Sequence, residues 1–203
     1  NIELINYAKR LGIQTNKPKA GLTDLKESGY VRLHTDNAVL IADLAAIGPN
    51  YLTGHAHADT LSFELSVNGK RIFVNSGTSE YGSGAERQHQ RGTLAHNTVS
   101  VEKKNSSEVW SGFRVGSRAK VTYRLVGNNG MLMYASGAHD GYKRINKGLI
   151  HSRRFTLHEN TLKIADNISL PFKAEVRYYC HPDLIVNKDG NCSGFITNRD
   201  GLK

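Results

Sequence analysis

The chain has 203 residues, 38% of them hydrophobic, and a net charge of +9 from 27 basic and 18 acidic residues. With 20 glycines and only 4 prolines, this composition is typical of a soluble globular protein and excludes a collagen-like or disordered chain. No apolar run approaches the roughly 20 residues that a membrane helix needs, so we predict no membrane span.

Residues 1–13 show helical spacing, with apolar side chains at Ile2, Ile5 and Ala8. We interpret them as the tail of a helix or as a helix of a preceding domain. Residues 14–29 are polar and turn-rich, which indicates a linker or an exposed loop. The predicted division is therefore 1–29, the end of a helical region plus linker, and 30–203, a β domain. We interpret the chain as a fragment of a longer protein.

From Tyr30 onward, short alternating runs are separated by turn signals such as Asn68-Gly69 and Asp189-Gly190. Many short hairpin-linked strands without intervening amphipathic helices favour an all-β fold. We predict a large antiparallel β-sandwich preceded by a short N-terminal helix. The predicted strands are 30–34, 38–44, 61–67, 71–75, 98–101, 118–126, 131–135, 152–157, 161–168, 174–179, 184–186 and 194–197.

Residues 76–97 lack strand alternation and are rich in glycine, serine and charged groups. Loops of this length inside compact domains are usually functional or disordered. The density of reactive side chains favours a functional loop. Those side chains are Tyr81, Glu86, Arg87, His89, Arg91 and His96.

The run "YLTGHAHADTLSFEL" places His55, His57 and Asp59 two residues apart. In an extended chain they share one face, and the same row continues inward as Leu61 and Phe63. A pair of histidines separated by one residue commonly binds a metal, although the pair alone is weak evidence. The candidates for a third ligand are His96, Asp59 and Asn75.

The position of Asn75 depends on the register of the predicted hairpin. A two-residue Asn68-Gly69 turn pairs Val67 with Lys70 and directs Asn75 away from Phe63. One extra residue or a bulge would bring Asn75 back beside Phe63, toward His57. The sequence leaves both arrangements open.

The basic charge fits either an acidic polysaccharide or nucleic acid. The sequence contains no RNP-like aromatic strand, zinc-finger spacing or basic helix, so we predict no nucleic-acid partner. The two cysteines, Cys180 and Cys192, are placed too far apart for a local disulfide and form no metal motif.

Three motifs in this order resemble the heparinase II/III-like polysaccharide lyases, specifically their C-terminal β-sandwich region. The similarity covers about residues 30–180 and is far more specific than the histidine pair alone. The motifs are His55-x-His57-x-Asp59, the loop with Arg87 and Arg91, and His96-Asn97-Thr98.

The resemblance implies a fold and an activity. Whole members of the family pair an N-terminal α-helical toroid with this sandwich, and the cleft between them binds an anionic polysaccharide. They cut uronate-containing chains by β-elimination. The resemblance also implies a periplasmic or secreted location. Because the catalytic tyrosine and an asparagine normally come from the helical domain, we expect this chain alone to be inactive.

The resemblance also implies site residues. His55 matches a histidine of the catalytic site, and His57 and His96 match two zinc ligands. The third ligand is usually an aspartate whose place falls at Asn75, which weakens the expected zinc site, and Asp59 is the alternative. The predicted substrate contacts are Tyr81, Arg87, Arg91 and Asn97.

Other interpretations remain open. The two arginines could instead fix the loop through salt bridges to Glu80 and Glu86. The domain could be a non-catalytic carbohydrate-binding or scaffolding module, although such modules usually use several exposed aromatic side chains and this chain has one tryptophan, Trp110. A cupin-like metal enzyme fits less well, because Glu64 lies on the opposite face from His57.

Overall fold

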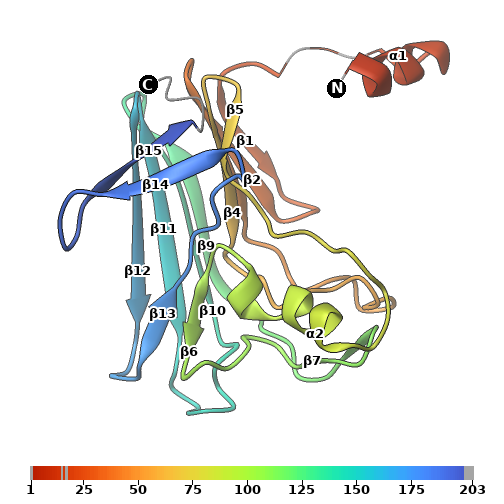
Figure 1. Ribbon diagram of the computed structural model, residues 1–203, viewed down its shortest axis with the longest axis vertical. Helices are drawn as coiled ribbons and strands as arrows, with labels where there is room; N and C mark the ends of the chain where they lie inside the picture. Colours follow the sequence, from red (N-terminus) through yellow and green to blue (C-terminus); the bar gives the residue numbers. More distant parts are fainter. Residues whose placement is uncertain (1, 15, 17, 199–203) are drawn as a thin grey trace.

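The computed structural model of the chain describes residues 2–14, 16 and 18–198, and its core is a sandwich of two antiparallel sheets (Figure 1). The all-β prediction is confirmed. The first sheet has five strands in sequential order: β1 (Gly21–Leu25), β2 (Tyr30–His34), β3 (Ala38–Asp43), β4 (Phe63–Val67) and β5 (Lys70–Phe73). Short turns connect β1 with β2, β2 with β3 and β4 with β5, whereas the long loop of residues 44–62 connects β3 with β4.

The second sheet has four strands in the order β12-β11-β10-β9. Side chains of both sheets form one apolar core, in which the rings of Phe63 and Phe155 meet edge to face at 5.5 Å between centroids. The strands of this sheet are β9 (Val121–Asn128), β10 (Met133–His139), β11 (His151–His158) and β12 (Thr161–Ile168).

Three two-stranded pairs complete the β structure. β6 (Val99–Val101) pairs with β13 (Ala174–Val176), and the paired strands bury Val99 and Val101 in a second, smaller core. The other two pairs are hairpins: β7 (Val109–Trp110) with β8 (Arg114–Val115), and β14 (Leu184–Lys188) with β15 (Gly194–Asn198).

The hairpin of β4 and β5 resolves the register that the sequence left open. Val67 pairs with Lys70 across the Asn68-Gly69 turn, and both turn residues have positive φ. The register then shifts between Leu65 and Ser66, so that Leu65 opposes Phe73. This bulge is the second of the two predicted arrangements, and it directs Asn75 toward the histidines.

The backbone at Leu61 reverses the expected alternation of buried side chains. The extended row of His55, His57 and Asp59 was predicted to point inward, but the residues between them, Ala56 and Ala58, are the buried ones. At Leu61 φ is +65°, a conformation that side-chain-bearing residues rarely adopt, and from there the odd positions are buried. The prediction of one straight strand from Leu61 was therefore wrong.

Two segments predicted to be irregular contain regular structure. β1 lies within residues 14–29 and pairs along its whole length with β2, so this part of the expected linker is a sheet strand. Residues 76–97 include helix α2 (Ala85–Arg91) and the 3-10 helix η1 (Thr93–Ala95). Hydrophobic periodicity could not reveal α2, because its buried side chains are Arg87, Gln90 and Arg91.

The predicted N-terminal helix is present as α1 (Ile2–Arg10), and none of its residues is buried. Cys180 and Cys192 are both free thiols, which agrees with the prediction of no disulfide. Within the described residues, no helix is long and apolar enough to cross a membrane.

Replacing Phe155 by alanine should lower the free energy of unfolding by about 3–5 kcal/mol, because a fully buried ring would leave a cavity between the sheets. Urea denaturation measures the loss. Phe195 in β15 is 50% exposed, so Phe195→Ala is the control and should cost less than about 1 kcal/mol. Equal losses in the two variants would contradict the assignment of Phe155 to the core.

Candidate functional site

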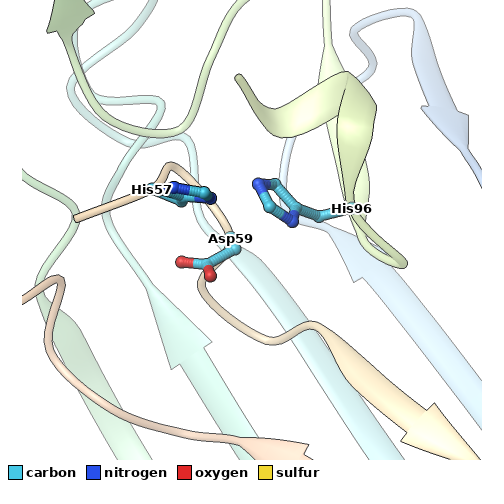
Figure 2. A group of neighbouring side chains, drawn as sticks. All are labelled: His57, Asp59 and His96. Atoms are coloured by element: carbon cyan, nitrogen blue, oxygen red, sulfur yellow. The ribbon is translucent and has the colours of Figure 1, made fainter. Parts of the chain in front are cut away.

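Three side chains with metal-ligating atoms meet beside the start of β4. His57 and Asp59 come from the loop before this strand, and His96 follows η1. Their ligand atoms all lie within 4.8 Å of one another. Figure 2 shows the two imidazoles on either side of a gap, with the Asp59 carboxylate next to it. The structure brings together the two predicted histidine ligands and Asp59, the alternative third ligand.

Both imidazoles favour the neutral form that binds metals. Burial, reinforced by Arg87 and Arg91, lowers the pKa of His57 to about 4. Burial and the neighbouring His57 lower the pKa of His96 to about 3. His96 is fully buried, and its Nε2 atom has no hydrogen-bond partner among the described residues. Two imidazoles, one of which has an orphaned ring nitrogen, and one carboxylate form a donor set that fits zinc.

A second carboxylate, that of Asp43 at the end of β3, influences Asp59. Burial raises the pKa of Asp43 to about 7, although its Oδ1 atom accepts a hydrogen bond of 2.8 Å from the Ala45 N–H. Burial and the charge of Asp43 raise the pKa of Asp59 well above its usual value. A cation bound at Asp59 would therefore have to displace a proton from this pair.

Asn75, which the resemblance predicted as a weak third ligand, contacts His96 rather than completing the cluster. Its Oδ1 accepts from the Gly77 N–H at 3.0 Å, and its Nδ2 lies 3.2 Å from Nδ1 of His96. In this orientation the amide donates to Nδ1, so the ring proton of neutral His96 sits on Nε2. Metal binding at Nε2 would require the amide to turn over and present its oxygen to Nδ1–H.

Arg87 is a buried cation next to the cluster. Its Nη1 atom lies 3.4 Å from Nε2 of His57, and its Nε donates to the Gly112 carbonyl at 3.2 Å. The Nη2 atom is buried without a hydrogen-bond partner among the described residues. The guanidinium lies 5.2 Å from the ring centre of Tyr81. Arg87 thus supplies positive charge directly beneath an exposed aromatic ring.

Arg91 and Asn97 are bound to backbone groups. The Arg91 side chain is fully buried and donates only to backbone carbonyls. Asn97 donates to two carbonyls and accepts from the Tyr179 N–H at 2.6 Å. Substrate contact by either residue would break these bonds, so the geometry favours a structural role. The carbonyl partners of Arg91 are those of Ala56, Trp110, Ser111 and Arg114.

The alternative prediction was that Arg87 and Arg91 fix the loop through salt bridges to Glu80 and Glu86. Among the described residues, neither arginine forms an ion pair with Glu80 or Glu86; only the backbone N–H of Arg87 reaches Glu80, at 3.3 Å. The loop is fixed mainly by carbonyl oxygens. The guanidinium charges are therefore not neutralised by these carboxylates.

His55 is exposed beside an aromatic surface. Its ring meets Tyr81 edge to face at 5.7 Å between centroids, and Tyr81 stacks on Phe113 at 6.2 Å. Tyr81 and Phe113 are 57% and 49% exposed. The exposed rings leave His55 and Tyr81 free to contact a ligand, in contrast to Arg91 and Asn97.

A cavity of about 730 Å³ extends from the cluster toward β2 and β3, and His55, His57 and Asp59 line its wall. Tyr30 and Asp43 also line it, and neither was predicted from the sequence. An acidic residue inside a predicted strand could have marked Asp43, because buried carboxylates are rare outside functional sites. Nothing in the sequence marks Phe113.

The sequence of the chain matches the model of a known protein family. The family model for the heparinase II/III-like C-terminal domain matches residues 17–202. No curated protein sequence matches the chain.

Several solved structures share the fold. Heparan sulfate lyase HepC from Pedobacter heparinus has a TM-score of 0.63 and 19% identity, over 88% of this chain and 27% of that protein. A heparinase III gene product has a TM-score of 0.58 and 24% identity, over 82% and 25%. A further heparinase III has a TM-score of 0.56 and 21% identity, over 77% and 23%. The chain thus spans about a quarter of the length of these proteins.

Replacing Asn75 by aspartate should strengthen zinc binding about tenfold or more, because a carboxylate can accept from both the Gly77 N–H and His96 Nδ1–H without turning over. Competition titration with a chromophoric chelator measures the affinity. Asn187→Asp, in β14, adds the same charge elsewhere and is the control. Unchanged affinity in Asn75→Asp would show that residue 75 does not influence the cluster.

The stability of the metal-free chain should fall as the pH falls from about 6.5 to 4. Four histidines have lowered pKa values in the folded chain, so the unfolded chain binds more protons in this window. They are His57, His96, His139 and His151.

Asp43 acts in the opposite direction, because with a pKa near 7 it holds a proton in the folded chain at a pH where the unfolded chain has lost it. Asp43→Asn should therefore steepen the loss of stability on acidification. Urea denaturation at pH 7, 6 and 5 with a chelator present measures both effects. A shallower dependence in the variant would contradict the raised pKa of Asp43.

Proposed function

Because the chain belongs to the heparinase II/III-like family of polysaccharide lyases, we propose that it is the C-terminal domain of an enzyme that cleaves a uronate-containing anionic polysaccharide by β-elimination. Its main support is the exposed His55–Tyr81 pair above the buried guanidinium of Arg87. His55 lines the same cavity as His57 and Asp59 of the metal-ligating cluster.

The reaction explains why these groups would gather. A base removes the C5 proton of the uronate, the bond between C4 and O4 breaks, a C4–C5 double bond forms, and O4 leaves with a proton. The C5 proton becomes acidic only when the neighbouring carboxylate is neutralised. The cationic Arg87, lying in a largely dry environment, provides positive charge for that purpose without competing carboxylate partners among the described residues.

His55 is the group of this chain best placed for proton transfer or charge stabilisation. It is exposed, whereas His57 and His96 are turned into the cluster. Histidine is the side chain that enzymes use most often to take and return a proton. Tyr81 packs against it and offers both a phenol and a flat face for a sugar ring.

The metal part of the proposal rests on this chain's donor set. His57, Asp59 and His96 would hold a zinc ion, with Asn75 orienting His96. Such an ion would add positive charge beside Arg87 and so help to neutralise a substrate carboxylate. The depressed pKa values of His57 and His96 support it, because metal ligands must be unprotonated.

The rest of the enzyme lies outside this chain. We propose that an N-terminal helical toroid supplies the other catalytic groups and the opposite wall of a polysaccharide cleft. An intact anionic polymer does not cross a membrane, so we also propose that the protein acts in the periplasm or outside the cell.

In the full-length protein, His55→Ala should lower turnover of a uronate polysaccharide by about 10²–10⁴-fold, the usual contribution of a proton-transfer group. The absorbance of the unsaturated product, followed over a panel of uronate polysaccharides, measures the rate. His158→Ala removes a partly exposed histidine at the end of β11 and is the matched control, with no change expected.

Two results would contradict the proposal. Absence of unsaturated product with every polysaccharide would argue against lyase activity. Tight binding of anionic glycans combined with unchanged turnover in His55→Ala would instead favour a non-catalytic binding module.

A further inference from the structure

Arg153 of β11 reaches from the second sheet to both segments that carry the cluster. Its side chain is 1% exposed. Its Nη1 atom donates to the Leu61 carbonyl at 2.9 Å and to the Asn97 carbonyl at 2.6 Å. Leu61 lies two residues after Asp59, and Asn97 directly follows His96. One guanidinium nitrogen therefore joins the backbone next to two members of the cluster.

The other side of the guanidinium is fixed by Asp166, which lies directly opposite Arg153 on β12. Arg153 Nε donates to Oδ1 at 2.7 Å and Nη2 donates to Oδ2 at 2.9 Å, so the pair is bidentate. Burial raises the pKa of the Asp166 carboxyl, but hydrogen bonds from His151 and Arg153 outweigh burial and hold this pKa at about 2. A bidentate pair fixes the orientation of the guanidinium plane and hence the direction of Nη1.

Two buried histidines fix Asp166 in turn. The Gly141 N–H donates to His139 Nδ1 at 3.0 Å, so the proton of neutral His139 is on Nε2 and is donated to His151 Nδ1 at 3.1 Å. His151 Nε2 then donates to Asp166 Oδ1 at 2.7 Å. Each hydrogen bond in this series, from Gly141 to Asp166, has a defined direction. The series ends on the carboxylate that orients Arg153.

The two segments joined by Arg153 share no strand pairing. β4 pairs with β3 and β5, whereas β6, which follows Asn97, pairs with β13. The two segments are joined instead by side-chain bonds, from Thr98 to the Thr60 carbonyl and from Asn97 to the Phe63 carbonyl. Arg153 donates to both segments at once and is itself anchored to the opposite sheet.

We propose that Arg153, held by Asp166, is a positioning residue that sets the separation of Asp59 and His96 and thereby the metal affinity of the cluster. This inference rests on the proposed metal site. A lysine could not replace the arginine, because a single ammonium on a flexible stem cannot hold a carboxylate and two carbonyls in fixed directions.

Arg153→Lys keeps the charge and should weaken zinc binding about 10–100-fold, a loss similar to that caused by removing groups that orient metal ligands. Chelator competition on the chain measures the affinity. The visible spectrum of the cobalt-substituted site should also change, because the ligands would adopt a different geometry. Asp166→Asn leaves the arginine in place with a weaker anchor and should lower the affinity by a smaller factor, which also provides a readout if Arg153→Lys does not fold.

Leu157→Ala is the stability control. Leu157 is buried in the same strand but four residues from Arg153, about 13 Å along the strand, so this variant should lose stability without losing zinc affinity. Zinc affinity of Arg153→Lys within twofold of wild type would overturn the proposal. Equal weakening in Leu157→Ala would also overturn it, because general destabilisation would then explain the loss.

Hydrogen exchange of the metal-free chain separates this inference from the proposed metal site. Arg153→Lys should speed exchange in residues 57–62 and 95–99 relative to Leu157→Ala. If wild type binds no zinc, the metal site fails, and the exchange rates still decide whether Arg153 orders the two segments. Unchanged exchange there would overturn the positioning role.

Discussion

The left-handed backbone at Leu61 is the constraint on which the site depends. Before it, Ala56 and Ala58 are buried, and the polar side chains that alternate with them line the cavity. After it, Phe63 and Leu65 enter the sandwich core. A Cβ atom on Gly137 of β10 would lie 2.6 Å from Leu61 Cδ2, so a glycine opposite leaves room for this side chain. The Leu61 N–H donates to the backbone carbonyl of Asp43, and the Leu61 carbonyl accepts from Arg153 Nη1. These two hydrogen bonds hold the unusual conformation.

This reversal accounts for what the sequence could and could not predict. Alternation and turn residues located most strands of both sheets, and the Asn68-Gly69 turn identified its hairpin, because those signals are local. The reversal at Leu61 is not local, since it depends on Gly137 and Arg153 in the other sheet. The histidines were therefore recognised as a candidate site, but with the wrong face of the chain buried.

The missed helix α2 has a related cause. Its buried face consists of Arg87, Gln90 and Arg91, whose polar groups mainly contact carbonyls and other polar side chains of neighbouring loops. Such a helix has no apolar stripe and is stable only in its tertiary setting. The two arginines differ in their hydrogen bonds. Arg91 donates to backbone carbonyls, whereas Arg87 lies beneath Tyr81 with an Nη2 atom that has no hydrogen-bond partner among the described residues. Residue type and spacing alone could not separate these roles.

In the proposed metal site, His57, Asp59 and His96 bind one ion and Asn75 supports His96 from outside. Anomalous X-ray diffraction at the zinc edge, from crystals of the chain grown with zinc, tests this most directly. We expect one strong peak within bonding distance of the three side chains, with the Asn75 oxygen facing Nδ1 of His96. A fully occupied peak elsewhere, or none among these residues at saturating zinc, would contradict it.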